Sequence, residues 1–587
     1  MTTNADVLAM LGEMATLTTL DEETNQSFKV RAYESARLAV EAHGADVTAL
    51  TQAELQKIKG VGKAIAAKIR ELVDTGAVAE LQALRAAYPP AFVELSRIPG
   101  LGPKTLKQLR SQLGVEDLAG LKAAIEAEQV RTLPRMGAAS EAKLAKAIER
   151  LGLTGKDRRT PVARARPLAE RLVDELRLVD SVQDVLFCGS LRRMAETVGD
   201  IDITVAATRP DLVMAAVRAH PAVHEIVVSG DTKTSFLTAA GAAGASIQVD
   251  VRVVAPEQLG AATLYFTGSK AHNIELRQRA IERGWLLNEY GLLDADGGVI
   301  ASRTEAEIYA ALDLTYVPPP MREATGEVEA AARGELPEVV QLADIRGDLH
   351  YHTDRSGDGR APLEDMVKVA ADRGYSYLAI TDHGEDLAIN GSTRAQMLAH
   401  RDRIRALQEE YPDLRILFGC ELNIGAAGGL DYDADFRREF DYTVASVHSH
   451  FDGSARDQTA RLVKAIADPT VDSIGHLTGR YIGRRPGIEL DIDIVLEALH
   501  HFDVALEING ALDRLDAASD VVRRAVERGV KLVINTDSHH TSELGRMEYG
   551  VLTAQRGWVP RDQVINTWDR ERFLTWVATH RENAPGA

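Results

Sequence analysis

Three aspartates in the middle of the chain have the spacing of a site for divalent metal ions. Asp200 and Asp202 lie in "VLFCGSLRRMAETVGDIDITV" (185–205), where we expect a strand, a Gly-Ser turn, a short helix and a second strand. Residues at i and i+2 point to one face of a strand, so both carboxylates can reach the same ion. Asp250 is the lone acid of the β-branched segment "IQVDVRVV" (247–254), where burial is costly unless a cation or hydrogen bonds compensate the charge. Three such carboxylates on adjacent strands predict two bound ions and in-line phosphoryl transfer: one ion lowers the pKa of the attacking hydroxyl, and the other binds a triphosphate.

The histidines indicate a second metal site nearer the C-terminus. Of the 16 histidines, 11 lie between His350 and His540. From about Asp344 onward, seven β-rich runs alternate with helical stretches, which predicts a βα barrel. Barrel enzymes build their sites at the C-terminal ends of the strands, so ligands scattered along the sequence should converge. Six of the seven runs end in a candidate ligand, "VALEING" (504–510) being the exception: His350 and His352, His383, Glu421, His448, His476, and Asp537 with His539.

Glycine turns in the first third of the chain predict contacts with nucleic acid. Segments 58–72 ("IKGVGKAIAAKIREL") and 98–114 ("IPGLGPKTLKQLRSQLG") each place Gly-x-Gly before an amphipathic helix, and both resemble the helix-hairpin-helix motif. The N–H groups at such a helix N-terminus can hold a DNA phosphate. A third copy, 133–151, has Ala139 in place of the second glycine, and we do not expect it to bind phosphate. The expected DNA-binding residues are Gly60, Gly62, Lys63, Gly100, Gly102 and Lys104.

Length, charge and cysteine content are those of a multidomain protein of a reducing compartment. A chain of 587 residues is too long for one hydrophobic core, and two cysteines cannot form a disulfide framework. We expect a cytoplasmic protein without a membrane span, because no secretory signal or long apolar run is present. The net charge of −19 is uneven, with 0 in residues 1–150, −4 in 151–320 and −15 in 321–587. A basic surface for phosphate binding is therefore compatible with the upstream part.

The middle segment resembles the palm and thumb of the family X DNA polymerases. The palm motif is carried by Gly189-Ser190, Arg192-Arg193, Glu196 and Gly199-Asp200-Ile201-Asp202, and segment 264–292 is similar to the thumb throughout. The resemblance implies that Asp200, Asp202 and Asp250 are the catalytic metal ligands. It also implies that Ser190 and Arg193 contact nucleotide phosphates, that Tyr265, Phe266 and Gly268 line the sugar, and that Asn273 and Arg277 contact the minor groove. The nucleotide-binding residues so implied are Gly189, Ser190, Arg193, Gly199, Tyr265, Phe266, Gly268, Asn273 and Arg277.

The first helices resemble the small N-terminal domain in which some members of that family carry 5′-deoxyribose-phosphate lyase activity. Lys68 stands at the position of the Schiff-base lysine, with Tyr33 nearby in the pattern. A nucleophilic lysine needs a depressed pKa, for which the sequence offers no sign. We therefore expect Lys68 to be a DNA-contacting or solvated lysine, with lyase activity as the alternative.

The C-terminal segment resembles the PHP (polymerase and histidinol phosphatase) domain. The resemblance implies two or three ions of the Mn²⁺ or Zn²⁺ kind, bridged by Glu421, and phosphoester hydrolysis. Asp358, rather than the nearer Asp354, takes the ligand position after the His-x-His pair. Arg480 could meet a phosphate. The related amidohydrolases are the alternative, but they use a modified lysine as the bridge. The implied metal ligands are His350, His352, Asp358, His383, Glu421, His448, His476, Asp537 and His539.

These inferences predict a multidomain architecture with helical helix-hairpin-helix domains, an α+β nucleotidyltransferase palm with a thumb, and a (β/α)7-type PHP barrel. The expected segments are an N-terminal helical domain with the first hairpin (1–86), a fingers-like helical domain with the second (87–155), the palm (156–260), the thumb (261–318), a linker (319–342) and the PHP hydrolase (343–577).

The expected function is DNA-directed DNA synthesis across short gaps in DNA repair. The PHP site is expected to act as a metal-dependent 3′–5′ exonuclease that removes 3′-terminal nucleotides, or as a phosphoesterase that processes damaged 3′ ends. The expected partners are gapped or primer-template DNA, dNTPs and two Mg²⁺ or Mn²⁺ ions in the palm. We expect a monomer that associates with the nucleoid during repair. A small-molecule phosphoesterase of the histidinol-phosphatase type tethered to DNA, and a non-enzymatic DNA-end-bridging scaffold, are the alternatives.

Overall fold

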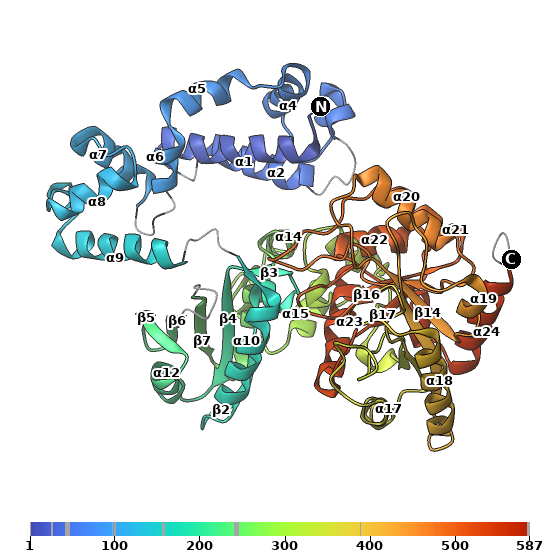
Figure 1. Ribbon diagram of the computed structural model, residues 1–587. Helices are drawn as coiled ribbons and strands as arrows, with labels where there is room; N and C mark the ends of the chain where they lie inside the picture. The colour runs from blue at the N-terminus through green and yellow to red at the C-terminus, as the bar shows by residue number, and fades with distance from the viewer. Residues whose placement is uncertain are drawn as a thin grey trace. The chain divides into compact units, whose positions relative to one another are not determined.

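The computed structural model divides the chain into two compact units. It describes residues 2–24, 27–41, 47–96, 98, 101–134, 136–154, 159–239, 246–387 and 389–583. One unit comprises Met1–Arg159 with Leu237–Gln248, and the other comprises Thr160–Phe236 with Val249–Ala587 (Figure 1). No helix among the described residues is long and apolar enough to cross a membrane.

The segment before residue 159 is helical, as the sequence predicts. Leu11, Met14, Ile69, Leu106 and Leu121 belong to one continuous apolar core. Its helices are α1 (Asn4–Asp21), α2 (Phe28–Glu41), η1 (Val47–Ala49), α3 (Gln52–Leu55), α4 (Lys63–Thr75), α5 (Ala79–Ala87), α6 (Pro90–Leu95), α7 (Pro103–Leu113), α8 (Leu118–Glu126), η2 (Val130–Thr132) and α9 (Ala138–Thr154).

The middle segment contains a five-stranded sheet in the order β2-β4-β7-β6-β5. The two strands expected to carry the aspartates, β4 and β7, are neighbours in that sheet. Helix α10 packs against β2 and β4. The elements are β1 (Thr160–Pro161), α10 (Val162–Arg177), β2 (Val182–Phe187), α11 (Gly189–Arg192), β3 (Thr197–Val198), β4 (Asp200–Ala207), α12 (Pro210–Ala219), β5 (Val223–Ser229), β6 (Lys233–Thr238) and β7 (Gln248–Val254).

A smaller helical segment with a three-stranded sheet, β10-β9-β8, follows. The expected linker 319–342 is ordered here and contains η4 and α16. The reason is burial, because Met321 and Val328 join the core around Leu264 and Leu276. The elements are η3 (Pro256–Gln258), α13 (Leu259–Thr267), α14 (Lys270–Ile281), β8 (Leu286–Asn288), β9 (Gly291–Leu293), β10 (Val299–Ala301), α15 (Glu305–Ala311), η4 (Pro319–Met321) and α16 (Glu327–Arg333).

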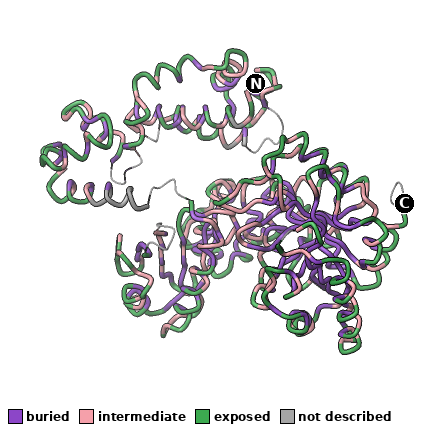
Figure 2. Tube along the Cα trace, viewed as in Figure 1, coloured by how far each residue is buried: buried purple, intermediate pink, exposed green. Residues whose placement is uncertain are grey.

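The C-terminal segment is a barrel of seven parallel strands, which confirms the predicted architecture. The sheet order β11 to β17 follows the chain, and a parallel bridge between Tyr351 and Ser538 joins its first and last strands. Figure 2 shows buried positions gathered along these strands. The strands are β11 (Gly347–Asp348), β12 (Tyr377–Ile380), β13 (Arg415–Asn423), β14 (Tyr442–Ser446), β15 (Ser473–Ile474), β16 (Ala505–Asn509) and β17 (Leu532–Asn535).

The end of the barrel where its strands begin is closed by α24. Phe573 and Trp576 of that helix pack against Tyr377 and Tyr442, the first residues of β12 and β14. The opposite end, where the strands finish, is therefore the end available for a site. The helices are η5 (Leu342–Asp344), α17 (Leu363–Asp372), α18 (Arg394–Gln408), α19 (Ala434–Arg437), α20 (Ala455–Ile466), α21 (Ile492–His501), α22 (Ser519–Glu527), η6 (Thr541–Arg546), α23 (Met547–Arg556), η7 (Arg561–Gln563), η8 (Ile565–Thr567) and α24 (Arg570–Asn583).

Candidate active sites

The histidines and carboxylates at the strand ends of the barrel meet in one cluster. Glu421, from β13, stands at its centre, and its carboxylate lies 2.9 Å from His383 Nδ1, 3.1 Å from His448 Nε2 and 3.0 Å from His476 Nε2. The Nε2 atoms of His350 and His352 are each 3.4 Å from the same carboxylate. Ligands from separate strands therefore share one carboxylate.

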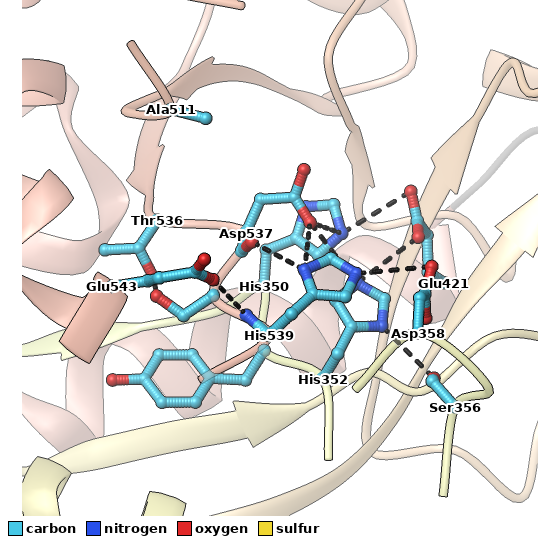
Figure 3. A network of polar contacts seen from close by, with 12 residues as sticks. His350, His352, Ser356, Asp358, Glu421, Ala511, Thr536, Asp537, His539 and Glu543 are labelled. Atoms are coloured by element: carbon cyan, nitrogen blue, oxygen red, sulfur yellow. Dashed lines mark hydrogen bonds and ion pairs between the residues drawn. The ribbon is translucent and has the colours of Figure 1, made fainter. Parts of the chain in front are cut away.

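Asp537 and Asp358 complete the cluster. Asp537 Oδ1 lies 3.6 Å from His350 Nε2 and 3.4 Å from His352 Nε2, and Figure 3 shows the two imidazoles between Asp537 and Glu421. Asp358 Oδ2 lies 3.4 Å from His383 Nε2 and 3.5 Å from His539 Nε2. Asp354 is exposed and belongs to none of the ligand groups among the described residues.

The donor atoms suit metal ions. Three overlapping groups have ligand atoms within 4.8 Å of one another: His352, Asp358, His383 and His539; His350, His352 and Asp537; and His383, Glu421 and His448. The Nε2 atoms of His350 and His352 are buried and have no hydrogen-bond partner. A buried polar atom without a partner is costly unless a cation occupies the space that it faces. Mixed nitrogen and oxygen ligands fit ions of the Mn²⁺ or Zn²⁺ kind.

Without an ion, the electrostatics of the cluster favour the anionic form of Glu421 and the neutral form of His352. Burial alone would raise the pKa of Glu421, but the charges of His448, His350 and His383 lower it well below its usual value. Burial, with the positive charges of His539 and His383, lowers the pKa of His352 to about 4. An anionic carboxylate and a neutral imidazole are the species that coordinate cations. Burial alone would lower the pKa of His383, but Glu421 and Asp358 raise it to about 10, so a bound cation must displace that proton.

Glu507 is a supporting residue that the sequence reasoning missed. It lies in β16, the strand without a candidate ligand, and its carboxylate accepts from His350 Nδ1 at 2.7 Å and from the backbone N–H of His476 at 2.6 Å. These bonds turn His350 Nε2 toward the cluster. The signal that could have revealed it is a lone acid in an apolar strand, the same argument that was applied to Asp250.

The middle segment brings the three predicted aspartates to neighbouring strands. Asp200 and Asp202 begin β4, and Asp250 lies in β7. Asp202 and Asp250 line a small cleft with Lys233, Arg252 and Phe266. Burial, together with the negative charges of Asp200 and Asp250, raises the pKa of Asp202 to about 7.

The aspartates are not as closely grouped as the barrel ligands. Among the described residues, the groups of three or more side chains that could share an ion all lie in the barrel. One reason is that Asp250 Oδ2 is paired with Lys233 Nζ at 2.7 Å. The carboxylate chemistry nevertheless fits divalent ions such as Mg²⁺ or Mn²⁺.

Gly189 allows the predicted phosphate-binding turn to approach Asp202. Its φ of +62° is in the left-handed region, and a Cβ atom there would lie 2.5 Å from Asp202 Oδ2. Only glycine fits such a position. Ser190 follows in the short helix α11, whereas Gly199 is exposed, with open space where a Cβ would be.

The predicted nucleotide-contacting residues of the thumb lie together. Tyr265 and Phe266 pack edge to face with their ring centroids 5.1 Å apart, and Thr267 separates them from Gly268 (φ +69°). Asn273 Nδ2 donates to the carbonyl of Tyr265 at 2.7 Å, and Arg277 Nε donates to the carbonyl of Asn273 at 3.2 Å. Tyr265, Asn273 and Arg277 line one small recess.

Two predicted phosphate contacts, Arg193 and Arg480, have protein partners. Arg193 Nε donates to Glu323 at 3.0 Å, and its NH1 donates to the carbonyl of Thr267 at 2.5 Å. Arg480 NH2 donates to Glu196 at 2.7 Å, so this barrel arginine is paired with a residue of the palm motif.

The first hairpin has the geometry that its sequence predicts. Gly60 has φ +105°, and Gly62 precedes α4, whose first residue is the exposed Lys63. Gly102 likewise precedes α7, and Lys104 is the second residue of that helix, whereas Gly100 lies outside the described residues.

Lys68 is held in its ammonium form. Burial would lower its pKa, but an ion pair with Glu80 at 2.9 Å and the neighbouring Tyr33 raise it. A nucleophilic amine needs the opposite shift.

Four family models match the chain. They are a helix-hairpin-helix domain (residues 2–78), a SAM-like helix-hairpin-helix tandem (92–150), the DNA polymerase beta thumb (262–323) and the PHP domain (348–511). The chain thus combines a polymerase thumb with a PHP domain.

Similar proteins fall into two groups. The "DNA polymerase/3'-5' exonuclease PolX" of Bacillus subtilis is 36% identical over 575 residues, which cover 97% of this chain and 99% of that protein. A "Probable phosphatase" of Acetivibrio thermocellus is 29% identical over 243 residues, 40% of this chain and 96% of that protein. A "Probable phosphatase" of Shewanella sediminis is 30% identical over 240 residues, 39% and 93% respectively. The chain belongs to the bacterial PolX group of family X DNA polymerases with a C-terminal PHP domain.

Proposed function

We propose that this protein fills short gaps in DNA with its palm and thumb and removes 3′-terminal nucleotides with its barrel. The observation that carries the proposal is that one chain holds two separate ligand-rich sites, one on β4 and β7 and one at the strand ends of the barrel. The full-length relative in Bacillus subtilis, which is named for both activities, supports it.

In the palm, Asp200, Asp202 and Asp250 would hold two Mg²⁺ or Mn²⁺ ions, and in the barrel the clustered ligands would hold two or three ions of the Mn²⁺ or Zn²⁺ kind. When bound, such ions activate the attacking oxygen and neutralise the charge of the phosphates. Arg193 and Ser190 bind the triphosphate of a dNTP, and Tyr265 and Phe266 line its sugar. Lys233 would separate from Asp250 when that carboxylate binds a metal ion.

The helix-hairpin-helix turns bind the gapped or primer-template DNA. Gly62–Lys63 and Gly102–Lys104 present N–H groups and ammonium groups to backbone phosphates at the start of α4 and α7. Gly60, with its positive φ, shapes the first of these turns. The protein acts as a monomer in the cytoplasm, on the nucleoid during repair, and Lys68 contacts DNA rather than forming a Schiff base.

One labelled gapped duplex tests both activities. We expect Asp200→Ala to abolish gap filling with dNTPs while Mn²⁺-dependent 3′ degradation continues. We expect His352→Ala to do the reverse. The proposal fails if Asp200→Ala leaves gap filling intact, or if His352→Ala leaves degradation unchanged.

A second candidate function is hydrolysis of a small phosphate monoester by the barrel. The relatives named as probable phosphatases favour it, because they match only 243 and 240 residues, about two fifths of this chain. Wild-type protein given a phosphate monoester and a 3′-recessed duplex in parallel separates the two functions. Turnover of the monoester alone would favour the phosphatase.

A further inference from the structure

The loop 479–487 of the barrel begins three residues after the candidate ligand His476. The N–H of Gly479 donates to the carbonyl of His476 at 2.8 Å, so the loop starts at the ligand cluster itself. At its tip, a Cβ on Gly483 would lie 3.0 Å from Pro161 Cγ of β1. The loop therefore spans from the barrel cluster to the strand pair β1–β3, which directly precedes Asp200.

Stacked aromatic and guanidinium groups hold the loop in place. The guanidinium of Arg485 lies 3.9 Å from the ring centre of Phe451 and 4.8 Å from that of Tyr481. An antiparallel bridge joins Tyr481 to Arg485. Arg514 lies 4.3 Å from the Tyr481 ring centre and donates to the Tyr481 hydroxyl at 2.7 Å.

Three arginines around the loop already have partners. Arg514 Nε is 3.6 Å from Asp537 Oδ2. Arg480 is bound to Glu196, and Arg485 donates to the carbonyl of Gly479 at 2.6 Å. These three side chains are therefore structural or tied to the cluster, and they are not available for a ligand.

Arg484 is different. It is exposed, and its guanidinium makes no hydrogen bond or ion pair within the described part of the chain. It lines a cleft of about 500 Å³ with Glu196, Arg480 and the rest of the loop. The segment 321–587 carries a net charge of −15, so a guanidinium without a counter-charge is unusual in this part of the chain. A free guanidinium on a rigid loop is suited to binding a phosphate group.

We propose that Arg484 binds a backbone phosphate of the DNA strand whose 3′ end lies in the barrel site. This inference rests on the proposed function. The loop lies between the candidate ligand His476 and the strand pair β1–β3 that precedes Asp200. It can therefore hold a DNA strand that runs from the palm site to the barrel site. The ligand is thus a nucleic-acid phosphate a few nucleotides from the 3′ end, and not the phosphate under attack.

The test uses full-length protein with Arg484→Ala, Arg484→Lys and the matched control Arg373→Ala. Arg373 is also exposed and makes no side-chain hydrogen bond or ion pair in the described residues, but it lies just before β12, at the opposite end of the barrel. The substrates are a 5′-labelled oligothymidylate of 20 nucleotides and p-nitrophenyl phosphate, each with Mn²⁺ at several salt concentrations.

We expect Arg484→Ala to raise the KM for oligothymidylate about tenfold, with kcat unchanged. The slope of log(kcat/KM) against the logarithm of the salt concentration should become shallower by about one, as expected for the loss of one phosphate contact. Arg484→Lys should keep most of the affinity because the charge remains. Hydrolysis of p-nitrophenyl phosphate should be the same in all variants, since this small substrate does not reach the loop.

Two results overturn the inference while the proposed function stands. One is a KM for Arg484→Ala equal to that of Arg373→Ala. The other is a parallel loss on both substrates, which would place Arg484 in support of the cluster. A wild-type protein that hydrolyses p-nitrophenyl phosphate but leaves DNA intact would instead overturn the proposed function, and the inference with it.

Discussion

At the scale of single residues, the barrel site depends on groups that do not face the cluster. Glu507 accepts four hydrogen bonds, from His350, the backbone of His476, Asn535 and Asn509. All four donors point at one buried carboxylate. The Glu507 carboxylate can only accept a hydrogen bond from His350, so it fixes the tautomer of that imidazole. The proton is on Nδ1, and the lone pair of Nε2 is directed into the cluster.

We therefore expect Glu507→Gln to weaken metal binding and 3′ degradation by about 10- to 100-fold, although residue 507 touches no substrate. The amide would place an N–H group against one of the existing donors. Titration calorimetry with Mn²⁺ on the full-length protein measures the affinity directly. The control is Glu497→Gln on the exposed face of α21. Unchanged Mn²⁺ affinity in Glu507→Gln would contradict the supporting role.

At the scale of elements, the buried acid of α15 connects the palm to the thumb. Both oxygens of Glu305 accept from Arg192 at 2.9 Å, and Arg322 donates to Oε1 at 2.6 Å. Arg322 is completely buried, between the rings of Tyr309 and Tyr316. Arg322 lies in the segment 319–342 that the sequence predicted to be a linker. It is part of the thumb core because its charge is paired with that of Glu305. Burial alone would raise the pKa of Glu305, but Arg322 and Arg192 lower it to about 2.

Glu305→Gln should destabilise the protein by about 3 kcal/mol at pH 7, because it leaves Arg322 buried without a counter-charge. A lowered pKa means that the stabilisation is present above the ordinary glutamate value of 4.5 and is lost as the pH falls toward 2. The stability gap between variant and wild type should therefore shrink below about pH 4.5. Urea unfolding of variant and wild type at pH 7, 5, 4 and 3 measures this gap.

The matched control for this prediction is Glu307→Gln, on the exposed face of the same helix. It should change stability by less than about 0.5 kcal/mol. A gap for Glu305→Gln that stays constant down to pH 3 would show that the ion pairs are not its source.

At the scale of the whole C-terminal unit, one carboxylate joins the thumb, the palm and the barrel. Glu323 Oε1 accepts from Arg193 at 3.0 Å and from Arg556, the last residue of α23, at 2.5 Å. Arg556 also donates to the carbonyl of Arg193 at 3.0 Å. If Arg193 binds the dNTP, its guanidinium must separate from Glu323. Arg556 of the barrel then continues to neutralise the Glu323 carboxylate.

The two partners should then act in opposite directions. Glu323→Gln should lower the KM for dNTP about threefold, because it releases Arg193. Arg556→Gln should raise the KM by a similar factor, because the whole charge of Glu323 then holds Arg193. Gap-filling kinetics at varied dNTP concentration measure both, with 3′ degradation unchanged in each variant.

The control is Glu329→Gln, exposed on α16. If both substitutions shifted the KM in the same direction, Glu323 would not be a competitor for Arg193. The effect would then reflect a general loosening of the contact between the thumb and the barrel.

Local patterns in the sequence were enough to define the architecture and most of the candidate ligands. Short β-rich apolar runs mark the strands, and strand ends in a parallel barrel must lie at one edge. For that reason the sequence alone groups His350, His383 and Glu421, and it places the Asp-x-Asp pair on one strand face.

The tertiary structure alone decided which charges are paired. His350 and Glu507 are 157 positions apart, Arg480 and Glu196 are 284 apart, and Arg556 and Glu323 are 233 apart. No local periodicity encodes such a pair, since each member merely looks like a charged residue in its own segment. Burial selects the partner, because a charge removed from water must find the opposite charge or a hydrogen bond among whatever the fold brings near. The same reason singles out Arg484, the one arginine of its loop for which the described structure provides no partner.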